Sequence, residues 1–183
     1  MLDESLGTIY TAKSGTRYLM RDARPDELDE IYAVWQAGME QHGYAIDPAK
    51  RAGYVAHLTW MMQSRNEVYK LWVAEAETGE IAGWQGLMPY VNNPFSRELS
   101  GECSTYVRPS SQAGGVAHIL LYHVIAHART TPLHHVVAFV AEDNKAVEQI
   151  GGKLGGWQRI GVIPPSHKPP KRPGMVLHVH MLG

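Results

Sequence analysis

The stretch Tyr106–Ala128, "YVRPSSQAGGVAHILLYHVIAHA", contains the most informative pattern of this chain. A strand-like run ends at Arg108-Pro109, a polar loop with Gly114-Gly115 follows, and a long apolar helical pattern begins after it. A loop between a strand and a helix N-terminus offers unpaired backbone N–H groups and the positive end of a helix dipole, so it suits an anion such as a pyrophosphate. The alternative is that the two glycines only make a tight turn, because short glycine motifs are weak evidence.

Around this stretch, helices and strands follow one another in an order typical of a single α+β domain. Further helices are predicted at 24–41, 48–63 and 143–154, and strands at 16–23, 68–76, 81–90, 102–107, 134–141, 157–163 and 175–181. We therefore predict a mixed, mostly antiparallel sheet of about seven strands, flanked by about four helices, with one βαβ unit inside it. Residues 1–16 are predicted to form an N-terminal arm with a short strand near 8–12, and residues 17–183 the domain.

The composition limits the kind of partner that the chain binds. Its 183 residues, 44% of them hydrophobic, suffice for one core. With 17 Lys+Arg against 18 Asp+Glu, the net charge is near zero, which argues against a nucleic-acid surface or a basic membrane anchor. The single Cys103 excludes an intramolecular disulfide, and the sequence shows no signal-like start and no apolar run of membrane-spanning length. We expect a cytoplasmic protein with a small-molecule partner.

Several segments match one family pattern in its order along the chain. In "QAGGVA", Gln112, Gly115 and Ala117 have the spacing Gln, two residues, Gly, one residue, Ala. "TYVRP" precedes this motif, "AEDNKAVEQIGGKLGGWQRIG" follows it, and "RDARPDELDEI" opens the domain. Together these segments resemble the GCN5-related N-acetyltransferases, the GNAT family. The resemblance implies the fold of that family, acetyl-CoA as the acyl donor, and an amine as the acceptor.

The resemblance also implies roles for individual residues. The backbone of Thr105, Tyr106 and Val107 would face the pantetheine arm of acetyl-CoA. The pyrophosphate would be wrapped by the loop residues Gln112, Ala113, Gly114, Gly115, Val116 and Ala117. Asn144 would face the pantetheine or the thioester sulfur, although a helix N-cap is an equally good interpretation of this residue.

Glu102 is the candidate catalytic base. Period-two alternation places Glu102, Ser104 and Tyr106 on one face of the predicted strand. A carboxylate there can remove the proton of an ammonium group, whereas the alternative is an ordinary solvated strand-end carboxylate. Pro94-Phe95 in the preceding loop and a Glu just before "STYV" resemble the phosphinothricin and methionine sulfoximine N-acetyltransferases. This likeness implies a small amino-acid-like amine as the acceptor. It fails in the segment 37–54 and at Gly151, where those enzymes carry His, so the acceptor stays open and includes peptide N-termini and lysines.

The acid that protonates the departing thiolate is missing from its usual place. Many family members have a Tyr, and some a His, seven residues after the Asn, where this chain has Gly151, followed by Gly152. Solvent, Tyr122 and Tyr106 are the remaining candidates for this acid.

Two functions therefore stay open. The first is an N-acetyltransferase, an acyltransferase for groups other than aminoacyl, that acts on a primary amine. The second is a catalytically lapsed acyl-CoA-binding module. A homodimer is compatible with either function.

The histidines and the cysteine are assigned mainly structural roles. Three histidine pairs have spacings that metal ligands can use, namely His123/His127, His134/His135 and His178/His180. No Cys or carboxylate companion completes a ligand set, so we predict no metal. The helical pair is expected to be solvated. Cys103 alternates away from Glu102 and is expected to be a core thiol rather than a nucleophile.

Overall fold

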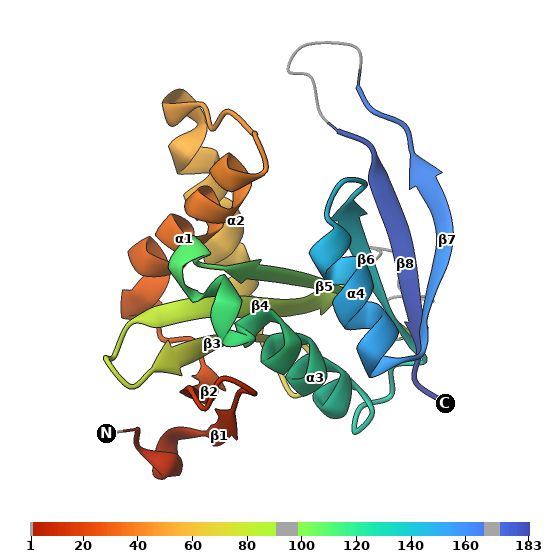
Figure 1. The fold of residues 1–183 in the computed structure, drawn as a ribbon. Coiled ribbons are helices and arrows are strands. Elements are labelled where there is room, and N and C mark those ends of the chain that lie inside the picture. Colours follow the sequence, from red (N-terminus) through yellow and green to blue (C-terminus); the bar gives the residue numbers. More distant parts are fainter. Residues whose placement is uncertain (1, 91–98, 167–172) are drawn as a thin grey trace.

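The computed structural model describes residues 2–90, 99–166 and 173–183, and in these ranges the strands form one eight-stranded sheet (Figure 1). The sheet order is β1-β2-β3-β4-β5-β6-β8-β7. The strands are β1 (Thr8–Thr11), β2 (Arg17–Asp22), β3 (Lys70–Ala76), β4 (Ile81–Pro89), β5 (Ser100–Val107), β6 (His135–Ala141), β7 (Trp157–Ile163) and β8 (Met175–Met181). All neighbours are antiparallel except β5 and β6, which are parallel. The predicted α+β class and mixed sheet are confirmed. The strand beyond the predicted seven is β1, which corresponds to the short strand predicted near 8–12 and pairs with β2. The division into an arm and a domain stays a prediction.

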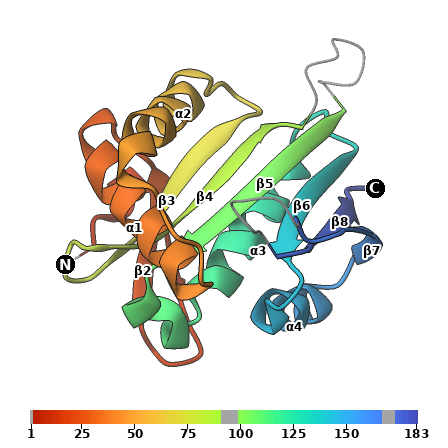
Figure 2. The ribbon, with the colours of Figure 1, turned by 90° about the horizontal axis from the view of Figure 1, so that it is seen from above.

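Four α-helices in the described ranges cover the two faces of the sheet. They are α1 (Leu28–Gln41), α2 (Arg51–Gln63), α3 (Val116–Ala128) and α4 (Lys145–Leu154). Figure 1 shows α1 and α2 above the β3–β5 strands and α3 below them, and Figure 2 shows β6 beside β5 with β8 and β7 beyond it. The fold therefore has one core under α1 and α2, and another under α3 that α4 extends. None of the helices described is both long and apolar enough to cross a lipid bilayer.

Strand β5 lies at the centre of this arrangement because its alternate side chains enter the two cores. Cys103 and Val107 are buried in the core under α3. Tyr106 packs against the core under α1 and α2, and Glu102 is registered with Met88 of that same core. The period-two alternation predicted for this strand is confirmed. Its consequence is that β5 presents different side chains to the two helical layers.

Candidate active site

The pairing of β5 with β6 stops before either strand ends. The register joins Ser100 to His135, Gly101 to Val136 and Glu102 to Val137, although β5 continues to Val107 and β6 to Ala141. Beyond the third pair, β5 and β6 are no longer paired with each other. Unpaired strand edges can bind an extended ligand through its amides, as an added strand would. We use the name β5–β6 fork for the Glu102–Val137 pair together with the strand ends that follow it, 103–107 of β5 and 138–141 of β6.

The residues predicted to face pantetheine lie on the β5 side of this fork. Thr105, Tyr106 and Val107 follow the last pair with β6. The hydroxyl of Thr105 donates to Oε1 of the fully buried Gln85 at 2.5 Å, which turns this side chain toward β4. The Thr105 side chain therefore ties β5 to β4, while the edge of β5 that faces β6 has no strand pairing past the fork. Whether pantetheine binds there stays a prediction.

Arg108 fixes the exit from β5. Its backbone N–H donates to Ala82 O at 2.8 Å, and its Nε donates to Ile81 O at 3.1 Å. The guanidinium also pairs with Glu30 of α1 at 3.3 Å and with Glu80 at 3.0 Å. These contacts join the end of β5 to β4 and α1. The loop that follows therefore starts from a fixed position.

Both glycines of the loop have structural reasons to be glycine. The loop forms a short 3-10 helix, Pro109–Gly114, and Gly115 then begins α3 with φ +76°, a left-handed conformation that other residues rarely adopt. A Cβ on Gly114 would collide with the hydroxyl of Tyr18. The tight-turn interpretation thus accounts for the glycines themselves. It does not account for the helix start, where no side chain caps α3.

The uncapped start of α3 leaves donors for a ligand. The first N–H groups of a helix have no partner within the helix, and those of Val116 and Ala117 are in this position. The 13-residue helix also has no acidic residue in its first turn. An anion there would interact favourably with the helix dipole. Gln112 and Ala113 lie in the preceding 3-10 helix, and their contact with pyrophosphate stays a prediction, as it does for the other loop residues.

Glu102 is half-buried at the fork, on the face covered by α1 and α2. Among the residues described, no hydrogen bond or ion pair of its carboxylate is found. Burial raises the pKa of Glu102 above its ordinary value, because the charged form loses hydration without gaining a partner. A carboxylate with a raised pKa and no partner among the described residues is suited to accept a proton. The solvated strand-end alternative does not fit this burial.

Aromatic side chains stand beside Glu102 on the same face. The ring of Tyr106 packs on Trp84 with centroids 4.7 Å apart, and Trp35 packs on Tyr54 at 4.6 Å. Burial raises the pKa of Tyr106, while a hydrogen bond from the indole N–H of Trp35 acts in the opposite direction. These rings give the α1–α2 face an aromatic wall. Aromatic faces attract ammonium groups.

The two tyrosines proposed as acids point in different directions. Tyr122 is 51% exposed and contacts Tyr10 of β1, which lies at the opposite end of the sheet order from β7. This position does not favour a role at the β5–β6 fork. Tyr106 lies on the same face of β5 as Glu102, the face covered by α1 and α2. Asn144 caps α4, its Oδ1 accepting from Val147 N–H at 3.4 Å. The capping interpretation of Asn144 is confirmed, and contact with a cofactor stays a prediction.

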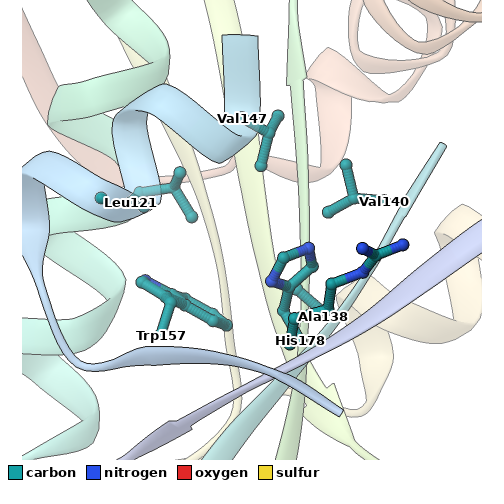
Figure 3. Close-up of a pocket in the computed structure, with 9 residues that line it drawn as sticks. Leu121, Ala138, Val140, Val147, Trp157 and His178 are labelled. Carbon is teal, nitrogen blue, oxygen red and sulfur yellow. The ribbon is translucent and has the colours of Figure 1, made fainter. Parts of the chain in front are cut away.

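A cavity of about 240 Å³ lies beneath α4, on the α3 face of the sheet, which is the face opposite to Glu102. Figure 3 shows side chains of α3, α4, β6, β7 and β8 around it, including Leu121, Val147, Val140 and Trp157. Gly151 and Gly152 complete the α4 side. The two glycines stand out in the sequence, but the cavity cannot be predicted from them, because its walls come from five separate elements.

Two histidines differ from expectation. His123 and His127 were predicted to be solvated, but both are partly buried and pack edge-on against Trp72, with centroids 5.2 and 5.0 Å away. His123 Nδ1 lies 3.0 Å from Tyr10 Oη, and His127 Nε2 lies 3.0 Å from Val68 O. Helical periodicity missed this because β1 and β3 extend the sheet under that side of α3. Burial lowers the pKa of His123.

The remaining candidates for chemistry are structural in the ranges described. Cys103 is buried, and burial raises the pKa of its thiol to about 12, so the predicted core thiol is confirmed. No group of three His, Cys, Asp or Glu side chains with metal-site geometry occurs among residues 2–90, 99–166 and 173–183. Pro94-Phe95, named for the acceptor loop, lies outside the described residues.

Comparison with known proteins identifies the family of this chain. Residues 17–156 match the family model "Acetyltransferase (GNAT) domain", and the chain belongs to this family. Among curated proteins, no sequence matches the chain.

Solved structures extend the likeness to most of the chain. One is provisionally described as a phosphinothricin N-acetyltransferase (20% identity, TM-score 0.76, 91% of this chain and 99% of that chain). A second is YncA from Salmonella typhimurium, provisionally described as an acetyltransferase and solved with its cofactor acetyl-CoA (20%, TM-score 0.69, 91% and 94%). A third is a ribosomal-protein-alanine N-acetyltransferase from Brucella melitensis (20%, TM-score 0.69, 89% and 99%). At these identities the likeness concerns the fold.

Proposed function

We propose that this protein is an acetyl-CoA-dependent N-acetyltransferase that acylates the primary amine of a small amino-acid-like molecule. The observation that carries the proposal is the position of Glu102: a half-buried carboxylate with a raised pKa stands at the last shared pair of β5 and β6. The donor is supported by the uncapped helix α3, which begins after the loop that leaves β5. Membership of the GNAT family supports the same donor.

The two faces of β5 supply the two substrates. Acetyl-CoA places its pyrophosphate on Gln112–Ala117 and its pantetheine along Thr105–Val107. The amine approaches from the α1–α2 face, where Glu102 and the aromatic wall favour a cation. Glu102 first takes a proton from the ammonium group, and the neutral amine nitrogen then attacks the thioester carbonyl. A C–N bond forms, the C–S bond breaks, and the nitrogen releases its second proton to solvent. Since position 151 has no side chain, the thiolate takes its proton from solvent.

A second candidate is a module that binds acyl-CoA without turnover. Gly151 favours it, because this position offers no acid to the leaving thiolate. An assay of thiol release across a panel of amines, run beside calorimetric titration with acetyl-CoA, separates the two. Thiol release that depends on one amine supports the enzyme. Binding without release on any amine supports the module. Cytoplasmic location and a homodimer stay predictions in either case.

The donor site is tested by Gly115→Val. A branched side chain there blocks close approach of pyrophosphate to the backbone, so affinity for acetyl-CoA is expected to fall by at least tenfold in calorimetry. The matched control is Gly79→Val, in the turn between β3 and β4, where φ is +86° and the residue is open to solvent. Both variants carry the same left-handed strain. Unchanged affinity in a folded Gly115→Val protein would overturn the donor site.

A further inference from the structure

The cavity beneath α4 is lined by residues of β6 that follow the β5–β6 fork. Val137 is the last residue of β6 paired with β5, and the next residue, Ala138, lines the cavity together with Val140. Both belong to the face of β6 that packs toward α3. A thioester that lies between the two strands would therefore have the cavity on one side of the sheet and Glu102 on the other.

On the α4 side, the cavity is lined by two residues without side chains, Gly151 and Gly152. Neither Gly151 nor Gly152 has a positive φ, so the backbone does not require glycine at these positions. A Cβ on Gly151 would meet Trp157 at 3.6 Å, an ordinary contact, and a Cβ on Gly152 would meet nothing within 4 Å. Glycine inside a helix is unfavourable relative to alanine. Neither backbone geometry nor crowding explains this pair, and what the pair provides is space.

The lining of the cavity suits an apolar chain. Leu121, Val140 and Val147 project into it from three elements (Figure 3), and the indole of Trp157 forms one wall. Its volume of about 240 Å³ exceeds the roughly 150 Å³ of an engineered apolar cavity that takes up benzene. Two polar side chains also line the cavity, the imidazole of His178 from β8 (Figure 3) and the exposed Arg159 from β7.

We propose that this cavity holds the tail of an acyl group longer than acetyl, so that the protein accepts acyl-CoA donors with apolar chains of about four to six carbons. The inference rests on the proposed transferase function and specifies its donor. The chemistry is unchanged: the amine displaces CoA from the thioester carbonyl, the C–N bond replaces the C–S bond, Glu102 takes the amine proton, and solvent protonates the thiolate. The added methylenes gain burial beneath α4.

The test compares acetyl-, butyryl-, hexanoyl- and succinyl-CoA with wild-type protein, by thiol release with an accepted amine and by calorimetric Kd. We expect butyryl- or hexanoyl-CoA to match or exceed acetyl-CoA in kcat/KM. Gly151→Leu fills the cavity from α4, and the ratio of hexanoyl-CoA to acetyl-CoA in kcat/KM and in affinity is expected to fall about tenfold or more. Gly53→Leu is the matched control, because Gly53 lies on α2 with nothing within 4 Å of an added Cβ.

The outcomes distinguish this inference from the function on which it rests. If no acyl-CoA binds or reacts, the proposed function fails. If acetyl-CoA reacts while longer donors do not, or if Gly151→Leu changes the ratio no more than Gly53→Leu, the acyl cavity is wrong and the transferase stands. A preference for succinyl-CoA over butyryl-CoA would overturn the apolar assignment. Should Gly151→Leu not fold, Gly151→Ala replaces it, with a smaller shift of the ratio in the same direction.

Discussion

Glu102 combines two properties that usually oppose each other, a position inside the fold and a negative charge. Its pKa is raised by burial, so the ionised form costs stability in the folded protein. A residue chosen for stability alone would be uncharged here. The cost is consistent with a carboxylate that serves as a base, since proton transfer is most efficient when the pKa of the base approaches the working pH.

Glu102→Gln separates catalysis from stability. The amide keeps the shape but not the basicity, so turnover is expected to fall by roughly 10²- to 10⁴-fold at neutral pH while acetyl-CoA affinity holds. The deficit should shrink at high pH, where the amine is already deprotonated. Rate profiles over pH, measured for both proteins, check this. A deficit that is the same at every pH would contradict a role as base.

The same variant has an expected effect on unfolding. The folded pKa of Glu102 lies above the ordinary value of 4.5, so the wild-type carboxyl favours the folded state below that value and loses this contribution as pH rises through the folded pKa. The Gln variant has no such loss. Its melting temperature at neutral pH is therefore expected to equal or exceed that of the wild type. A purely structural Glu102 predicts a lower one.

At the level of single residues, sequence reasoning succeeded where one strand or helix determines the outcome. Cys103 and Glu102 were assigned to opposite faces by alternation alone, and the structure agrees. It failed for His123 and His127, because their surroundings come from Trp72 and Tyr10, more than forty positions away in the chain. Helical periodicity describes the face a residue occupies but does not say what covers that face.

At the level of elements, the loop after β5 shows how local conformation and binding can use one feature. The left-handed Gly115 turns the chain into α3 and at the same time leaves the helix without a side-chain cap. A helix start that lacks a cap is less stable unless another group satisfies its N–H donors. The sequence predicted this loop because its residues are contiguous. It could not predict the cavity under α4, whose walls meet only in the folded chain.

Replacing either of two glycines near the end of α4 by alanine is expected to change the free energy of unfolding, in opposite directions. Gly151 is helical with room for a Cβ, so Gly151→Ala is expected to raise the free energy of unfolding by about 0.5–1 kcal/mol. Gly155 ends the helix with φ +70°, so Gly155→Ala is expected to lower it by about 1 kcal/mol or more. Urea unfolding followed by circular dichroism measures both. Equal effects of the two substitutions would contradict the described helix end.

At the scale of the whole molecule, a bound donor is expected to connect two parts of the sheet, β1 to β5 and β6 to β8, which share few backbone pairs. The parallel β5–β6 contact has three registered pairs, against seven in each of the antiparallel neighbours β4–β5 and β6–β8. A ligand in the fork adds contacts to both strands at once. Its binding energy therefore appears as resistance of the entire domain to unfolding rather than as a local effect.

Acetyl-CoA at about one hundred times its Kd is expected to raise the free energy of unfolding by about 2.7 kcal/mol. For a domain of this size, that corresponds to an increase in Tm of roughly 5–10 °C. Differential scanning calorimetry with and without the ligand measures it. Gly115→Val should lose most of the shift, and Gly79→Val should keep it. A shift equal in all three proteins would place the ligand elsewhere.

The short β5–β6 contact also bears on how the chain assembles during synthesis. Strands β1 to β5 pair with their neighbours in the order in which they are made, and each of these pairs is antiparallel. The β1–β2 and β3–β4 contacts are local and form quickly, whereas β2 and β3 pair across α1 and α2, and the parallel β5–β6 contact requires α3 to cross first. N-terminal parts of a protein emerge first from the ribosome. The five-stranded portion can thus fold co-translationally, and β6, β8 and β7 then join it through a seam only three residue pairs long.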